Sequence, residues 1–196
     1  MKIIAVSQKA DEYPDRNEVR DALDQQMTGF VESCNAILFP IPNYFSSDNV
    51  LLQWLGYLSP DGIILSGGED IGTNLKRDAI EETLLTYSED LRLPLLGICR
   101  GTQMIGARAG SKIKKVTGHA ALHHHIKGEI NGKVNSFHNN ALADKPKNFS
   151  IIARSIDNEI EAIRHDYLPW EGWMWHPERE KTFLMRDINR FKALLS

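Results

Sequence analysis

The sequence predicts a doubly wound α/β fold, built on a mostly parallel sheet with an antiparallel extension. Strand-like and helix-like segments alternate through the first two-thirds of the chain. Gly62–Leu65 and Leu93–Ile98 are continuous apolar runs, which are typical of parallel strands covered on both faces. After Gly110 strand-like segments follow one another without helices between them. No repeat or linker interrupts the pattern, so we expect residues 1–196 to form a single domain.

The elements of the parallel part begin with Lys2–Ser7, an apolar, β-branched run that predicts the first strand. Asp15, followed three residues later by Glu18, resembles a capping box and predicts the start of a helix. The apolar stripe of this helix would comprise Val19, Leu23, Met27, Phe30 and Val31. The later elements are predicted as strand Ala36–Ile41, helix Ser47–Leu58, strand Gly62–Leu65, helix Asn74–Leu91, strand Leu93–Ile98 and helix Arg100–Ala109.

The antiparallel extension is indicated first by a hairpin signal. Asn131-Gly132 lies between the strand-like segments Ile126–Ile130 and Lys133–Phe137, and both turn residues tolerate positive φ. The remaining elements are predicted as strands Phe149–Ala153, Ile160–Arg164 and Gly172–Trp175, followed by a helix Arg179–Leu195.

Composition excludes several broad classes of protein. The 196 residues include 23 Lys and Arg against 26 Asp and Glu, and the slightly negative net charge argues against nucleic-acid or membrane-surface binding. No apolar run approaches the ~20 residues of a membrane span, and the short apolar start resembles a strand and not a signal peptide. Cys34 and Cys99 are too few for a disulfide framework, so we expect a cytoplasmic protein.

Cys99 lies in Gly97-Ile98-Cys99-Arg100-Gly101, between a buried strand and a helix. A nucleophile at such a turn is held clear of the sheet at the carboxyl ends of the strands. The N-terminus of the following helix favours the thiolate. A buried structural cysteine is the alternative, since free cysteines are often fully buried.

Two further segments fit acyl-transfer chemistry with Cys99 as nucleophile. In Trp175-His176-Pro177-Glu178 a carboxylate follows a histidine by two residues, so Glu178 could orient His176 toward a thiol. Ser66-Gly67-Gly68 follows a buried strand, and its glycines permit a backbone N–H to approach a ligand. Taken singly, the first segment is a weak signal and the second fits a simple turn.

Four motifs in order resemble those of class I glutamine amidotransferase domains, in particular the free-standing γ-glutamyl hydrolases. They are Ser66-Gly67-Gly68-Glu69-Asp70, Gly97-Ile98-Cys99-Arg100-Gly101-Thr102-Gln103, Asn135-Ser136-Phe137-His138-Asn139 and Trp175-His176-Pro177-Glu178. The resemblance implies a flavodoxin-like glutaminase fold, a small-molecule γ-glutamyl substrate, and neither metal nor cofactor. The roles that it implies are a catalytic triad of Cys99, His176 and Glu178, an oxyanion hole from the backbones of Gly68 and Arg100, and substrate binding by Gln103, Ser136, Phe137 and His138.

Two other stretches resemble those of small γ-glutamyl-CDP-amidate hydrolases from bacterial surface-polysaccharide pathways. They are Arg20–Asp24 and Gly118–His125. The resemblance implies a phosphoramidate or nucleotide leaving group, such as CDP-amidate, and we expect Arg20 to bind its phosphate as a bidentate fork. The chain departs from longer relatives in its short connections and in Asn139-Asn140, which leaves the leaving group open.

Alternatives remain at three points. A glutaminase subunit could supply ammonia to a synthetase partner, although a free-standing enzyme is favoured. A redox sensor or chaperone could share the turn at Cys99 without needing His176. Finally, His119 and His123–His125 could bind zinc, but adjacent histidines diverge and no acidic partner shows ligand spacing, so a solvated or substrate-facing loop is expected.

Overall fold

The computed structural model describes residues 1–196 and is organised around a nine-stranded sheet. The helices are α1 (Gln25–Ser33), α2 (Asp48–Leu58), α3 (Leu75–Leu91), α4 (Arg100–Arg108) and α5 (Met185–Leu194). The strands are β1 (Lys2–Ser7), β2 (Lys9–Tyr13), β3 (Glu18–Ala22), β4 (Ala36–Ile41), β5 (Gly62–Leu65), β6 (Leu95–Ile98), β7 (Ile113–Lys115), β8 (Leu122–Gly128), β9 (Gly132–Ser136), β10 (Asn140–Leu142), β11 (Phe149–Ser155), β12 (Ile160–His165) and β13 (Trp170–Trp173).

The sheet has the order β4-β1-β5-β6-β13-β12-β11-β8-β9. Its first five strands are parallel, and the pairings from β13 to β9 are antiparallel. This arrangement confirms the predicted mostly parallel α/β sheet with an antiparallel extension. The parallel strands end at one edge, where ligands bind in folds of this kind.

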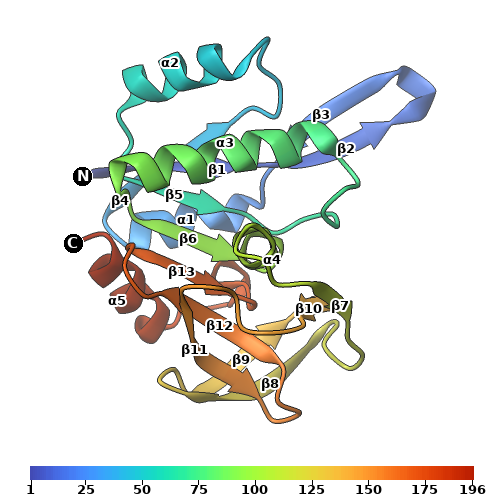
Figure 1. The fold of residues 1–196 in the computed structure, drawn as a ribbon, viewed down its shortest axis with the longest axis vertical. Helices are drawn as coiled ribbons and strands as arrows, with labels where there is room; N and C mark the ends of the chain where they lie inside the picture. The colour runs from blue at the N-terminus through green and yellow to red at the C-terminus, as the bar shows by residue number, and fades with distance from the viewer.

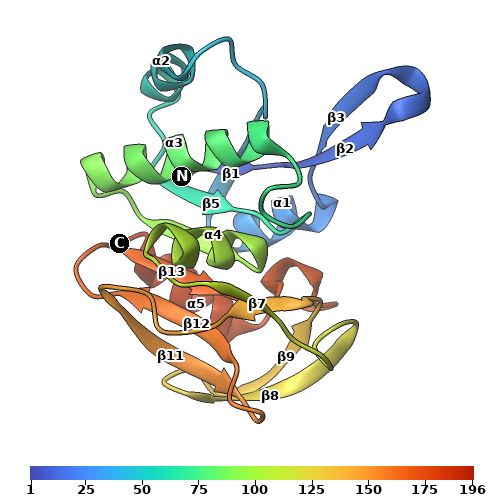
Figure 2. The same ribbon diagram turned by 45° about the vertical axis from the view of Figure 1, so that its right-hand side comes forward.

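Helices cover both faces of the parallel part (Figures 1 and 2). On one face, α1 and α5 pack Phe30, Val31 and Phe191 against the sheet. On the other face, α2, α3 and α4 bury a second apolar layer that includes Leu55 and Leu84. Strands enclosed in this way need apolar residues on both faces, which explains the continuous apolar runs of β5 and β6.

Local signals explain where the helices begin. The side chains of Asp24, Ser47 and Asn74 cap α1, α2 and α3 by accepting hydrogen bonds from backbone N–H groups of the first turn. The predicted boundaries of α2, α3 and α4 agree with the structure to within a residue. None of the helices combines the length and apolar character needed to cross a membrane.

The predicted helix from Glu18 was wrong in its first part. Lys9–Tyr13 and Glu18–Ala22 instead pair as the antiparallel hairpin β2–β3, which projects from the body of the molecule (Figure 1). Asn17 adopts φ +48° after the short helical turn Pro14–Arg16 and so completes a tight reversal. Val19 therefore lies 60% exposed on a strand, and α1 begins only at Gln25.

Several other elements also differ from the prediction. The predicted strand Gly172–Trp175 is β13, Trp170–Trp173, and the helix predicted from Arg179 begins at Met185. β7 and β10 were not predicted and form a small sheet of their own. The stretch expected as a loop at His123–His125 belongs to β8, which pairs with β9 in the predicted hairpin, and His119 is buried.

Candidate active site

Cys99 occupies a strained turn between β6 and α4. Its backbone has φ +51° and ψ −103°, a conformation that L-residues with a side chain rarely adopt. The turn is held because the Cys99 N–H donates to the Trp173 carbonyl at 2.7 Å. A Cβ on Gly101 would lie 2.1 Å from the Leu65 carbonyl oxygen, so only glycine allows α4 to start this close to β5. The sequence prediction of a sharp strand-to-helix turn is confirmed.

His176 and Glu178 form a buried pair beside this turn. His176 Nδ1 lies 2.6 Å from Glu178 Oε1, which leaves Nε2 for a second partner. Burial lowers the pKa of His176, but the Cys99 thiol and Glu178 carboxylate beside the ring raise it more, to about 9. The geometry therefore brings together the thiol, the imidazole and the carboxylate that the motifs predicted.

Asn135 holds the backbone of His176 from β9. Its Oδ1 accepts from the His176 N–H at 2.9 Å, and its Nδ2 donates to the His176 carbonyl at 2.7 Å. A second bond from Nδ2 reaches Glu180 at 2.7 Å. Asn135 was noted only as part of a motif, and its contact with a residue 41 positions away gives no local signal in the sequence.

The loop after β5 approaches the same place. A Cβ on Gly67 would lie 2.5 Å from His176 Cε1, so this residue must be glycine for the imidazole to fit. Gly68 follows with φ +152°. Arg100 is the first residue of α4, where backbone N–H groups have no acceptor within the helix. The two predicted oxyanion donors, Gly68 and Arg100, thus line one cavity with Cys99.

This cavity has a volume of about 140 Å³ and is lined by Gly68, Asp70, Cys99, Arg100, Gln103, Phe137, His138, Asn139 and Asn140. Three of the predicted substrate-binding residues, Gln103, Phe137 and His138, are therefore beside the thiol. Phe137 also contacts His176 edge-on, with ring centroids 5.8 Å apart. Ser136 is fully buried, and its hydroxyl donates to the His119 carbonyl and does not line the cavity.

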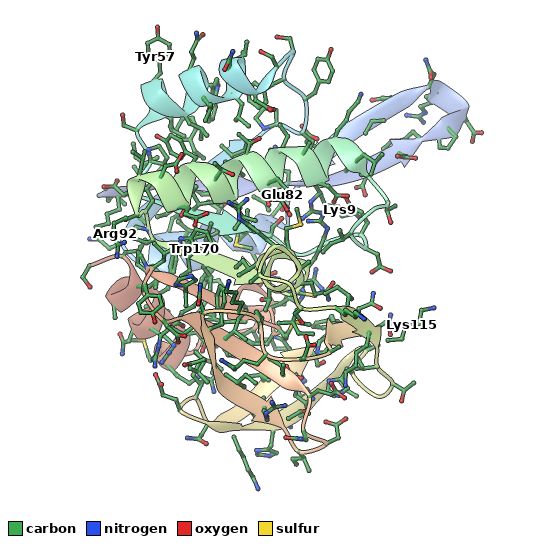
Figure 3. The ribbon with its side chains drawn as sticks, viewed as in Figure 1. Lys9, Tyr57, Glu82, Arg92, Lys115 and Trp170 are labelled. Carbon is green, nitrogen blue, oxygen red and sulfur yellow. The ribbon has the colours of Figure 1, made fainter.

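Arg20 is not brought to this cavity. It lies on the exposed part of the β2–β3 hairpin, where its guanidinium pairs with Glu18 and stacks on Tyr13 at 4.9 Å from the ring centroid. The predicted helix would have placed Arg20 beside the carboxyl end of β1, but these residues form the hairpin β2–β3 instead. Lys9 lies at the root of the hairpin (Figure 3). It lines a second cavity of about 260 Å³ together with Gly68 and Arg179.

A buried ionic network supports both halves of the predicted oxyanion hole. Arg77 of α3 donates to the carbonyl oxygens of Ser66 at 2.8 Å and Gly67 at 3.0 Å. Glu81 binds Arg77 Nε at 3.0 Å and also pairs with the Arg100 guanidinium. One carboxylate thus joins the loop before Gly68 to the residue after Cys99. Sequence reasoning missed this network because Arg77 and Glu81 lie on α3, whose many charged residues are typical of a solvated surface helix.

We expect Glu81→Gln to destabilise the protein by about 3 kcal/mol, because breaking a buried ion pair leaves an uncompensated charge. Glu82→Gln is the matched control, since Glu82 is the next residue on α3 (Figure 3). Glu82 pairs with Arg108 at the surface. Its loss should cost less than about 1 kcal/mol. Urea unfolding of both variants measures the difference, and equal midpoints would refute the supporting role of Glu81.

Residues 31–188 match the sequence profile of the family described as "Glutamine amidotransferase class-I". The chain belongs to this family. A solved structure from Thermoplasma acidophilum, described as one subunit of a GMP synthase, matches with a TM-score of 0.75 and 22% identity, covering 100% of this chain and 94% of that one. At this identity the likeness supports the glutamine amidotransferase fold alone.

Two curated glutamine amidotransferase relatives differ in what their names describe. The γ-glutamyl-CDP-amidate hydrolase of Campylobacter jejuni is 36% identical over 124 residues, which is 60% of this chain and 62% of the relative's length. A subunit of the glutamine-hydrolyzing GMP synthase of Thermococcus kodakarensis is 31% identical over 151 residues, or 71% of this chain and 77% of the relative. The family is therefore shown, and the choice between these reactions depends on the site.

Proposed function

We propose that residues 1–196 act as one glutamine amidotransferase-type hydrolase domain that cleaves a γ-glutamyl amide bond through a Cys99 thioester. The single observation that carries this proposal is the strained position of Cys99 beside the His176–Glu178 pair, whose ring and carboxylate atoms are 2.6 Å apart. A redox or chaperone relative has no need of such a pair, so its presence favours hydrolysis.

The proposed reaction has two acyl-transfer steps. The Cys99 thiolate attacks the γ-carbonyl carbon, and the backbone N–H groups of Gly68 and Arg100 stabilise the oxyanion. The His176 imidazolium protonates the departing nitrogen as the C–N bond breaks and the thioester remains. Neutral His176 then takes a proton from water, which attacks the thioester, releases glutamate and restores the thiol.

The γ-glutamyl group would occupy the cavity of about 140 Å³ that Gln103 and His138 line with Cys99. The leaving group must extend past His176, which protonates it. Beyond His176 the side chain of Arg179 lies over the Phe137 ring, 5.0 Å from its centroid, and also lines the second cavity with Lys9. Lys9 pairs with Asp11 at 2.6 Å and Arg179 lies 3.7 Å from Asp24, so an anionic leaving group would compete with these carboxylates for the two cations. A phosphoramidate or a nucleotide conjugate of the CDP-amidate type is such a leaving group.

A comparison of three substrates tests this proposal: free glutamine, a neutral γ-glutamyl amide and a γ-glutamyl phosphoramidate. We expect kcat/KM to be highest for the phosphoramidate. If glutamine is the best substrate, the free-standing hydrolase is excluded. If the neutral amide is best, the hydrolase stands and the anionic leaving group is wrong.

We expect Lys9→Ala to lower kcat/KM for the phosphoramidate by about tenfold, because one charge-assisted hydrogen bond to an anion is lost. The neutral amide should be cleaved at an unchanged rate. Arg20→Ala is the matched control from the same hairpin and should leave both rates within about twofold if the hairpin keeps its position. A larger loss for Arg20→Ala than for Lys9→Ala would mean that the hairpin folds over the ligand.

The second candidate is a glutaminase subunit that supplies ammonia to a synthetase. The similarity to the GMP synthase relative over 71% of this chain favours it. Such a protein would hydrolyse glutamine slowly alone and faster with a partner. Glutaminase activity that rises on adding a synthetase would therefore support this function over the free-standing hydrolase.

A further inference from the structure

Three histidines and one glutamate converge inside the antiparallel extension, apart from Cys99. His119 precedes β8, His124 lies on β8, His138 follows β9 and Glu161 lies on β12. His119 and His138 are each 2% exposed, and Glu161 is fully buried. β8 and β12 are not neighbours in the sheet, because β11 lies between them. The cluster therefore joins β12 to the β8–β9 hairpin across the intervening strand β11.

Three distances within the cluster, all measured from Glu161, fit ligands around a common ion. Glu161 Oε1 lies 3.2 Å from His119 Nδ1, 3.4 Å from His124 Nε2 and 3.5 Å from His138 Nε2. Four ligands at the bond lengths of a zinc ion, about 2.0–2.1 Å, lie at the corners of a tetrahedron with edges of about 3.4 Å. The ligand atoms of His119, His124 and Glu161 all lie within 4.8 Å of one another.

These buried atoms also lack other partners. His119 Nδ1, His124 Nε2, His138 Nε2 and both carboxylate oxygens of Glu161 make no hydrogen bond in the structure. Buried polar atoms are almost always satisfied, so five in one place need an explanation. Glu161 is fully buried with the three imidazoles beside it, so the cluster offers a carboxylate and three ring nitrogens to a cation.

Two of the histidines are oriented as metal ligands usually are. His119 Nε2 lies 2.9 Å from Asp157 Oδ2, and His138 Nδ1 lies 3.1 Å from the Asn140 carbonyl oxygen. A carboxylate or carbonyl on the far nitrogen places its proton there and leaves the near nitrogen unprotonated to bind a metal. Together Asp157 and Glu161 would offset the charge of a divalent ion.

We propose that His119, His124, His138 and Glu161 form a tetrahedral zinc site that stabilises the antiparallel extension. Four protein ligands close the coordination sphere, so the site is structural. It lies behind the cavity of Cys99, because His138 lines that cavity and the His119 carbonyl accepts the His138 N–H at 3.1 Å. The spacing of the histidines could not reveal the site, since the acidic ligand follows His124 only after three further strands.

The test measures Zn²⁺ and Co²⁺ binding, after chelator treatment, in a Cys99→Ala background that removes the competing thiol at the active site. We expect one equivalent of Zn²⁺ per chain and a rise in Tm of roughly 5–10 °C at a hundredfold excess over Kd. Co²⁺ should give the strong visible absorption of a tetrahedral site without a thiolate charge-transfer band.

The matched variants are His124→Ala and His125→Ala, which change neighbouring residues of β8. His124 faces Glu161, whereas His125 is exposed and should keep full binding when replaced. Binding lost in His124→Ala alone supports the site, and equal binding in the two variants, or none in the parent, overturns it. If no metal binds, the cluster is a network of protonated histidines, in which the Glu161 carboxylate raises the pKa of His119 to about 9. If His124→Ala does not fold, the tetrahedral cobalt spectrum of the parent decides.

Discussion

Cys99→Ala should abolish hydrolysis of γ-glutamyl amides, with kcat falling by at least about 10⁴-fold. No other group near the cavity can form the acyl intermediate, and removal of a nucleophile leaves only the weak catalysis of the oxyanion donors. Alanine keeps the Cβ of Cys99, so the strain at φ +51° is unchanged and the fold should persist. Steady-state rates with a γ-glutamyl amide, together with circular dichroism, measure both effects.

Cys34→Ala is the matched control, because Cys34 is the other cysteine of the chain and is also buried. Burial raises the pKa of the Cys34 thiol, which disfavours its thiolate. We expect this variant to keep most of its activity and to retain one thiol that reacts rapidly with iodoacetamide. Rapid alkylation that persists in Cys99→Ala, or full hydrolysis by that variant, would exclude Cys99 as the nucleophile.

The sequence was informative where neighbouring residues determine both the backbone and the chemistry. The turn at Cys99 could be predicted because an apolar strand, two glycines and a helix surround it within a few positions. His176 and Glu178 were predicted for the same reason, since a separation of two residues permits their contact at 2.6 Å. The parallel sheet followed from apolar runs that only strands covered on both faces require.

Features that depend on distant pairing could not be predicted. The stripe from Val19 to Val31 fits a helical period, but pairing of β2 with β3 overrode it in its first part. Asn135 meets His176 across 41 positions, and Glu161 meets His119 across the antiparallel extension. No local pattern distinguishes such an Asn or Glu from a solvated residue.

Arg20 shows how one wrong element misplaces a residue with a predicted role. A helix after the first strand would have placed Arg20 at the ligand-binding edge of the sheet, whereas the hairpin carries it outward. Lys9 was overlooked because a lone lysine after a strand has no distinguishing pattern. The residues that line the cavity of Cys99 were thus predictable from motifs, while the surroundings of the proposed leaving group depend on the course of one hairpin.

His176→Ala should lower kcat by roughly 10⁴–10⁶-fold and Glu178→Gln by roughly 10²–10⁴-fold, since loss of an orienting group leaves the base in place. The pH profile separates orientation from simple structural support. The pKa of His176 is raised to about 9, so its ring is protonated at neutral pH and can protonate the leaving nitrogen. In the wild type, kcat/KM should fall as pH rises through about 9, when this proton is lost.

Glu178 is one of the groups that raise this pKa, so Glu178→Gln should move the alkaline fall of kcat/KM to lower pH. A variant that merely loosened the fold would lower kcat/KM at every pH without moving the pH at which kcat/KM falls on the alkaline side. Glu178→Asp, which retains the charge on a shorter side chain, should restore part of the shift. His125→Ala changes an exposed histidine and should match the wild type throughout. Identical profiles for wild type and Glu178→Gln would contradict the assignment of Glu178 as the partner of His176, and the catalytic pair would then have to be sought elsewhere around Cys99.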